Sequence, residues 1–287
     1  MTSGVLLLDK PTGMTSAWAV SLVKRALPGK TRVGHTGTLD PLASGLLVLM
    51  IGGATRLSRY VGDMEKSYTA TAQFGAVSDS LDADGQIEDL EGELPARDDI
   101  EAALSDFIGR IEQTPPMASA VKVAGKRLYA LHREGKTVER EARTVEVEEF
   151  TLNNYDPESG EAEFFVRCGG GTYVRSLVAD AAEAVGSGAY LTALRREAVG
   201  RFSISDAIKP DAPGRIEEHL LPPEVALGGI SRFEVEAGAA KLIGNGRPLD
   251  SFGEVGKVAL FYEEALIAVY ADDGRTAKPE VVLWSAG

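Results

Sequence analysis

The order of strand-like and helix-like segments constrains the fold of this chain more than any other feature of its sequence. Between residues 68 and 74, apolar residues alternate with polar ones, the period of two that a half-buried strand requires. Over residues 16–27 and 100–111 the apolar residues recur at helical spacing instead. Strands and helices follow one another without a βαβ period, so the sequence predicts an α+β fold rather than a doubly wound sheet.

The remaining segments predict two domains. A chain of 287 residues exceeds the roughly 100–200 residues usual for one domain. Residues 32–45 are rich in Gly, Thr, Pro and Asp and predict an ordered loop, while residues 210–229 have the composition of a linker. We therefore expect a large domain over 1–228 and a small β-rich domain over 229–287. Strands are expected at 4–10, 46–51, 68–74, 118–123, 144–153, 161–168, 255–261, 266–270 and 281–284, and helices near 16–27, 100–111, 126–134 and 173–185.

The charge of the chain is unevenly distributed. Its net charge is −13, which is unfavourable for binding phosphates, yet residues 1–60 carry +5 and residues 113–143 carry +4. These basic segments permit RNA binding, but from charge alone solvated surface faces are the more usual explanation.

Several function classes are not supported. The longest apolar run, residues 45–53, is too short to cross a bilayer, and no secretory signal precedes the first strand, so we expect a cytoplasmic protein without a membrane partner. The single cysteine, Cys168, cannot form an internal disulfide, and the three histidines show no zinc-ligand spacing. We therefore expect no metal site.

The segment from Gly34 to Gly45, GHTGTLDPLASG, resembles the signature loop of the bacterial tRNA pseudouridine-55 synthases of the TruB type nearly residue for residue. Three further family segments occur in the same order: GVLLLDKP at 4–11, KSY at 66–68 with SLDADG at 80–85, and GTYVR at 171–175. The similarity runs from residue 4 to about residue 205. The turns at 245–247, 273–274 and 278–279 are similar to those of PUA-type RNA-binding modules.

This resemblance implies a pseudouridine synthase fold, with a mixed, largely antiparallel sheet flanked by helices and a C-terminal PUA-like domain. It also implies isomerisation of the T-loop uridine of tRNA, at position 55, to pseudouridine after base flipping. We expect no cofactor, a monomer and no obligatory protein partner.

Asp40 is the candidate catalytic residue. An Asp in a Gly-rich loop before a buried strand is usually a turn former on local grounds. The resemblance implies the essential carboxylate instead. It can attack C1′, attack the base, or remove the C2′ proton, and the sequence does not choose among these routes.

Two further charged residues are expected near Asp40. The resemblance implies that Arg175 pairs with Asp40 and keeps it ionised and oriented, whereas an exposed ion pair would contribute little. Asp82 matches an acidic position near the family's active site; the alternative, a carboxylate in a solvated loop, stays open.

Five other residues are candidates for substrate binding. Tyr68 lies on an alternating strand, where an aromatic residue usually packs in the core, but the resemblance places it against the target base, with its phenol near C5. Tyr173 would line the same pocket and Leu194 would form part of its wall. His35 would fill the gap that the extruded bases leave in the T-loop stack. Lys10 is either structural or phosphate-facing.

The basic segment at 113–145 matches a mobile insertion that closes on the T-arm of tRNA. Its cationic residues would position the RNA without reading its sequence. They are Lys122, Lys126, Arg127, Arg133, Lys136, Arg140 and Arg143. Two other functions stay open: an RNA-folding or RNA-binding module in which modification is incidental, and a guide-RNA-dependent pseudouridine synthase.

Overall fold

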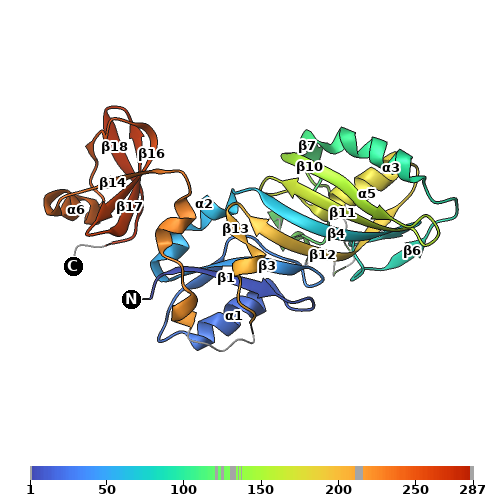
Figure 1. Cartoon of the computed structure of the whole chain (residues 1–287), viewed down its shortest axis with the longest axis horizontal. Helices are drawn as coiled ribbons and strands as arrows, with labels where there is room; N and C mark the ends of the chain where they lie inside the picture. The colour runs from blue at the N-terminus through green and yellow to red at the C-terminus, as the bar shows by residue number, and fades with distance from the viewer. Residues whose placement is uncertain are drawn as a thin grey trace.

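A computed structural model describes residues 2–284, except 120–121, 124–125, 130–133, 135, 137 and 211–215; for 122–123 and 126–127 it describes the backbone only. Figure 1 shows a long curved sheet with helices packed against it and a smaller sheet formed by the C-terminal part of the chain. The fold is α+β, as the sequence predicts.

Nine strands of the described residues form the large sheet. All neighbouring strands run antiparallel except β3 and β12, which are parallel, so the sheet is mixed and largely antiparallel. Two short strands, β2 (Val33–His35) and β13 (Phe202–Ser203), extend it beside β3 and β12. The order of the other seven is β1 (Gly4–Lys10), β3 (Ser44–Ile51), β12 (Ala189–Val199), β4 (Lys66–Phe74), β11 (Glu161–Cys168), β10 (Arg143–Tyr155) and β7 (Gly109–Gln113).

Three helices share one apolar core with a single face of this sheet. They are α1 (Ser16–Ala26), α3 (Arg97–Leu104) and α5 (Val174–Ala184). The Thr15 hydroxyl caps α1 by accepting the Trp18 backbone N–H at 3.1 Å. Asp98 and Asp99 lie in the first turn of α3, where their negative charges interact favourably with the positive end of the helix dipole.

The C-terminal sheet lies at one end of the large sheet, beyond α2 (Ser58–Gly62) (Figure 1), and η5 (Pro223–Leu227) contacts both α2 and β1. A second apolar cluster joins Val48 and Met50 of β3 to Ala259 and Phe261. Because β1 and β3 are buried on both faces, they read as continuous apolar runs rather than alternating ones. The small sheet has its own core with helix α6 (Ala237–Gly244). Its order is β14 (Ser231–Glu234), β16 (Val255–Tyr262), β17 (Ala265–Asp273), β18 (Thr276–Val282) and β15 (Leu249–Asp250).

The short elements lie mainly in the connections. They are η1 (Gly52–Leu57), α2 (Ser58–Gly62), β5 (Ala76–Ser78), β6 (Ile87–Asp89), η2 (Ser105–Phe107), β8 (Lys122–Val123), β9 (Lys126–Arg127), η3 (Ile204–Asp206), η4 (Ile216–His219) and η5 (Pro223–Leu227). Of the helices in the described part of the chain, none is long and apolar enough to span a membrane.

The structure corrects three of the local expectations. Strand β12, which the pattern of residues 189–199 does not predict, lies in the middle of the large sheet. The helix expected to reach residue 111 ends at Leu104; Gly109, with φ +91°, follows, and β7 begins there. Residues 126–127 pair with 122–123 instead of starting a helix; of the rest of that expected helix, Leu128 and Tyr129 are helical, Glu134 is in a turn and residues 130–133 lie outside the described residues.

Candidate active site

The loop that carries Asp40 is fixed to the first residue of α1. Ser16 is buried; its hydroxyl accepts the Leu39 N–H and lies within hydrogen-bond distance of the Leu39 carbonyl, both at 2.9 Å. Leu39 in turn is buried in the core. Beyond the loop, Gly45 has φ +101°, and a Cβ there would lie 2.3 Å from the Arg196 carbonyl oxygen. Only glycine therefore allows β3 to approach β12 this closely.

Arg175 lies in the first turn of α5 and is the centre of a buried polar network. Its Nη2 lies 3.0 Å from Asp40 Oδ2, and its Nη1 donates to Asp82 Oδ2 at 2.9 Å. The same guanidinium donates to the backbone oxygens of Ser80 and Ala118, both at 2.7 Å. The Arg175 and Asp82 side chains are each 5% exposed. Arg175 is therefore a buried residue with several hydrogen bonds and ion pairs, and it does not form an isolated ion pair on the surface.

The two carboxylates differ in their surroundings. The Asp40 side chain is 39% exposed and meets the cavity, whereas Asp82 is buried beneath Arg175. Burial raises the pKa of Asp40; the Arg175 guanidinium opposes this shift, and the Asp82 carboxylate adds to it. Arg175 thus favours the ionised form in the direction expected from sequence, but burial has the larger effect.

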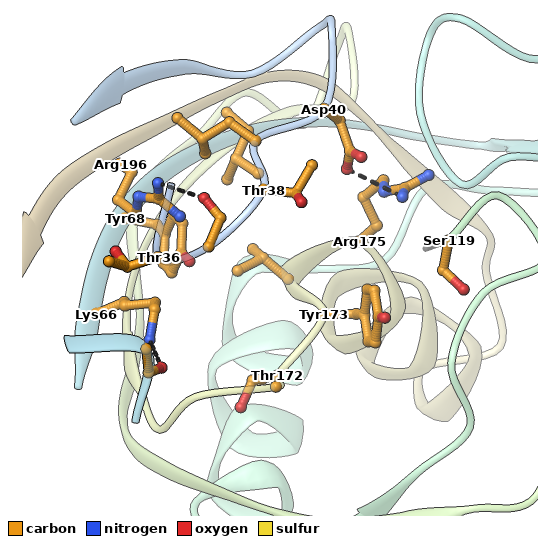
Figure 2. A pocket seen from close by; sticks show the side chains of 16 residues that line it. Thr36, Thr38, Asp40, Lys66, Tyr68, Ser119, Thr172, Tyr173, Arg175 and Arg196 are labelled. Carbon is orange, nitrogen blue, oxygen red and sulfur yellow. Dashed lines mark hydrogen bonds and ion pairs between the residues drawn. The ribbon is translucent and has the colours of Figure 1, made fainter. Parts of the chain in front are cut away.

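Two tyrosines and a leucine complete the cavity, whose volume is about 280 Å³ (Figure 2). Tyr68, Tyr173 and Leu194 line it together with Asp40 and Arg175. Such a volume lies just below the range of roughly 300–1,000 Å³ typical of small-molecule sites and suits one flat heterocycle. Burial raises the pKa of Tyr68, so its phenol stays neutral near pH 7.

Tyr173 is held by a residue that the sequence did not single out. The Gln113 side chain accepts the Tyr173 N–H at 2.7 Å and donates to the Tyr173 carbonyl oxygen at 3.1 Å. Gln113 is buried at the end of β7. Because β7 was read as helix from the sequence, this contact could not be anticipated.

Three of the sequence candidates do not line the cavity. Asp82 reaches it only through Arg175. Lys10 is fully buried, and its Nζ donates to the backbone oxygens of Pro11 and Met14 at 3.0 and 2.7 Å, which favours the structural alternative. His35 ends β2; its Nδ1 is buried, and within the described residues it has no hydrogen-bond partner.

The cavity also contains cationic residues that the sequence did not identify as site residues. Lys66 and Arg196 line it, and both are buried. Lys66 is two residues from Tyr68, and Arg196 is two residues from Leu194. Residues two apart on a strand point to the same face, so this alternation was the signal that could have located both cations. Reading it would have required residues 189–199 to be recognised as a strand.

A second hollow differs from this cavity in its chemistry. This hollow of about 590 Å³ is lined by Lys30, Arg32 and Arg56 but by no carboxylate, so it lacks an acid–base pair. Among the described residues no group of His, Cys, Asp or Glu could hold a metal ion.

The basic segment at 113–145 is described in part. Lys136 pairs with Glu134 at 2.7 Å, and Arg140 donates to the Pro115 carbonyl oxygen at 3.0 Å. Arg143 is the first residue of β10. Arg133 and the side chains of Lys122, Lys126 and Arg127 lie outside the described residues.

Comparisons with known proteins agree on one family. Residues 24–174 match the model of the TruB family pseudouridylate synthase N-terminal domain. A tRNA pseudouridine synthase B of Opitutus terrae is 44% identical over 76% of this chain and 92% of its own length. That of Lactobacillus acidophilus is 37% identical over 99% of both chains. Among solved structures, one of a Cbf5–Nop10–Gar1 complex aligns with a TM-score of 0.74 and 25% identity over 99% of this chain and 86% of that one.

Proposed function

We propose a specific reaction for this chain, which belongs to the TruB family of pseudouridylate synthases: it isomerises the uridine at position 55 of the tRNA T-loop, with Asp40 as the catalytic carboxylate. Its curated relatives are tRNA pseudouridine synthases, which are isomerases. The observation that supports the proposal best is the position of Asp40, 3.0 Å from a buried arginine in a cavity lined by two tyrosines.

The reaction needs a carboxylate at the sugar and flat surfaces at the base. The bond from N1 to C1′ breaks, the uracil rotates, C5 bonds to C1′, and the C5 proton leaves. Asp40 can attack C1′, attack the base, or take the C2′ proton, and Arg175 orients it for each. The neutral Tyr68 phenol lies in the same cavity, where C5 would be deprotonated.

The target nucleotide must leave the T-loop stack before it reaches Asp40. Unstacking costs a few kcal/mol, which contacts with a flipped base recover. Tyr68, Tyr173 and Leu194 supply such contacts from three different elements. His35 would fill the gap left in the loop, and its unbonded Nδ1 is consistent with a residue that meets RNA.

Two further parts of the chain would hold the tRNA. We assign residues 1–228 to the catalytic domain, with 113–145 as a basic clamp on the T-arm, and residues 229–287 to a PUA-like RNA-binding domain. Cationic residues in the clamp would contact phosphates and position the RNA. The enzyme would act in the cytoplasm as a monomer without a cofactor. Because contacts of Lys and Arg with phosphates release counterions, its affinity for RNA should fall as salt rises.

One experiment tests the reaction and the role of Asp40 together. The purified protein is incubated with an unmodified T-arm stem-loop, and pseudouridine is located by chemical mapping. Wild type should modify only position 55, and Asp40→Asn should abolish turnover while RNA binding stays measurable. The exposed Asp106→Asn serves as the control and should match wild type. Turnover by Asp40→Asn, or modification at another position, would contradict the proposal.

The same assay separates the alternatives. The structural similarity to the Cbf5 chain of a Cbf5–Nop10–Gar1 complex favours a guide-RNA-dependent synthase as the second candidate. Activity of the purified protein alone excludes that candidate. If catalytically inactive Asp40→Asn restores every phenotype of a deletion strain, RNA binding is the main task of the protein.

A further inference from the structure

Arg196 carries a buried positive charge that no carboxylate neutralises among the described residues. Its Nε donates to the Leu46 carbonyl oxygen at 2.7 Å, and its Nη2 donates to the Gly37 carbonyl oxygen at 3.1 Å. The residue is 2% exposed and belongs to the cavity lining. Arg175, in contrast, contacts two carboxylates. The two buried arginines of this cavity therefore differ in their electrostatic surroundings.

In the part of the chain that the structure describes, the titratable groups whose pKa responds to the Arg196 charge include no carboxylate. They are Lys10, His35, Lys66 and Tyr68. Burial first, and then the Arg196 charge, lower the pKa of Lys66 to about 8, against an opposing effect of Asp63. Burial raises the pKa of the neighbouring Cys168 thiol to about 11, so this thiol is neutral and supplies no negative charge.

A buried charge without a counterion is unfavourable for folding. It is tolerated here because the β12 backbone and two carbonyl oxygens hold the guanidinium in place. The resulting positive potential faces the cavity. Figure 2 shows Arg196 and Lys66 towards one end of it, with Asp40 and Arg175 towards the other. One end is thus suited to the sugar chemistry of Asp40, and the other to an anion.

The proposed reaction generates such an anion. When Asp40 attacks C1′ or removes the C2′ proton, the N1–C1′ electron pair leaves with the base, which becomes a uracil anion with its charge spread over N1, O2 and O4. In the first route C1′ bonds to an Asp40 oxygen. In the second the C2′ proton passes to Asp40 and a C1′–C2′ double bond forms. In the first route C5 then displaces the Asp40 oxygen from C1′, and in the second C5 adds to C1′ while Asp40 returns its proton to C2′. The C5 proton is lost and N1 takes up a proton, which gives the neutral product.

We propose that Arg196 is a catalytic residue that stabilises the detached uracil anion while the base rotates in the cavity. This role rests on the proposed function and deepens it. Fixed cations aimed at developing charge are effective because they need no reorganisation during the reaction. Here the backbone oxygens of Leu46 and Gly37 hold the guanidinium, so it stays in place while the base turns.

A purely structural role for Arg196 is the competing explanation, because its two hydrogen bonds also tie β12 to β3 and to the Asp40 loop. Two substrates distinguish the roles. A 5-fluorouridine in the target position releases a more stable anion, since fluorine withdraws electrons, and this anion needs less help from a cation. Distortion of the loop would slow both substrates equally.

The experiment measures single-turnover loss of the target N-glycoside from uridine and 5-fluorouridine T-arm RNA. We expect Arg196→Gln to lose about 10²–10³ in rate on uridine RNA, with RNA affinity little changed, and to lose less on 5-fluorouridine RNA. Arg196→Lys, which keeps the charge, should retain more activity and show the same dependence on substrate to a smaller degree. The matched control is Arg195→Gln on the opposite strand face, paired with Asp9, which should stay within about threefold of wild type on both substrates.

Equal losses on the two substrates, in Arg196→Gln or in Arg196→Lys, would overturn the proposal, as would an Arg196→Gln rate close to wild type. Arg196→Lys decides the matter if Arg196→Gln does not fold, which thermal unfolding reveals. Wild-type protein that forms no pseudouridine at the T-loop uridine would instead refute the proposed function itself.

Discussion

Replacing Asp82 by Asn removes the charge that holds Arg175 from below and leaves the volume of the side chain unchanged. In the folded protein, Asp82 Oδ2 accepts from Arg175 Nη1 at 2.9 Å, while Oδ1 accepts from the Ser80 hydroxyl and from the Asp84 N–H. An Asn amide oxygen can serve only one of these two sides. If it faces Arg175, the NH₂ group points at the Asp84 N–H, and one buried hydrogen bond is lost together with the charge.

The expected cost follows from burial. Both side chains are 5% exposed, so solvent screens this pair little. Breaking a buried pair costs about 3–5 kcal/mol, and we expect a value near the lower limit because Asn retains one contact and Asp40 remains beside Arg175. At about 2–4 °C per kcal/mol for a protein somewhat smaller than this one, a loss near 3 kcal/mol lowers the Tm by roughly 6–12 °C.

The pH dependence of turnover should change as well. The Asp82 carboxylate raises the pKa of Asp40, so removing its charge lowers that pKa. Asp40 must be ionised to act, and its ionised form is lost as pH falls through its pKa. The acidic limb of the pH–rate profile should therefore move to lower pH in Asp82→Asn, although the plateau rate falls because Arg175 is held less firmly.

Thermal unfolding and single-turnover pH profiles of wild type and Asp82→Asn measure both effects. Glu88→Gln, which removes an exposed carboxylate from nearby β6, is the control and should change neither quantity. A Tm within about 2 °C of wild type would show that the network contributes little to stability. An acidic limb that moves upward in pH would refute the electrostatic argument.

Three other predictions follow from the site. Gly45→Ala should destabilise the fold by about 1–3 kcal/mol or more, because φ is +101° and the added Cβ would lie 2.3 Å from a β12 carbonyl oxygen. Gly34→Ala is the control, because its Cβ would meet no atom within 4 Å. Urea titration of both variants measures the difference. Wild-type turnover should fall on the acidic side with a midpoint above 3.8, since burial raises the pKa of Asp40; a midpoint below 3.8 in the pH–rate profile would refute this. Lys10 is buried in the folded protein, where its pKa is about 8 against an ordinary value of 10.5. Between these two pH values the unfolded chain binds more protons than the folded one, so the free energy of unfolding rises with pH. Lys10→Met should remove about 3 kcal/mol of this rise, measured as the free energy of unfolding from pH 8 to 10.5.

The local patterns located most strands correctly but missed the one that organises the site. Residues 68–74 alternate strictly and form β4, buried at every second residue. Residues 189–199 carry Arg195, Arg196 and Glu197 in succession and show no comparable pattern, yet they form β12. Pairing with β3 and β4 on its two sides determines this strand, and those partners are distant in sequence.

The motifs also located much of the cavity, because residues from three of them line it. Asp40, Tyr68, Tyr173, Arg175 and Leu194 line it together. The motifs could not reveal how deeply their side chains are buried. The sequence left Asp82 and Lys10 each with two interpretations, and burial decides between them: the first lies beneath Arg175, and the second bonds to the carbonyl oxygens of its own turn.

By itself the sequence determined the α+β class, the candidate catalytic loop and the family resemblance, because periodicity and motif residues are properties of neighbours along the chain. Only the tertiary structure decided which charges are paired. Arg175 and Arg196 are both arginines that line the cavity, yet one meets two carboxylates and the other meets two backbone carbonyl oxygens. The electrostatic character of a buried cation depends on groups that come from distant strands, and these become neighbours only when the sheet forms.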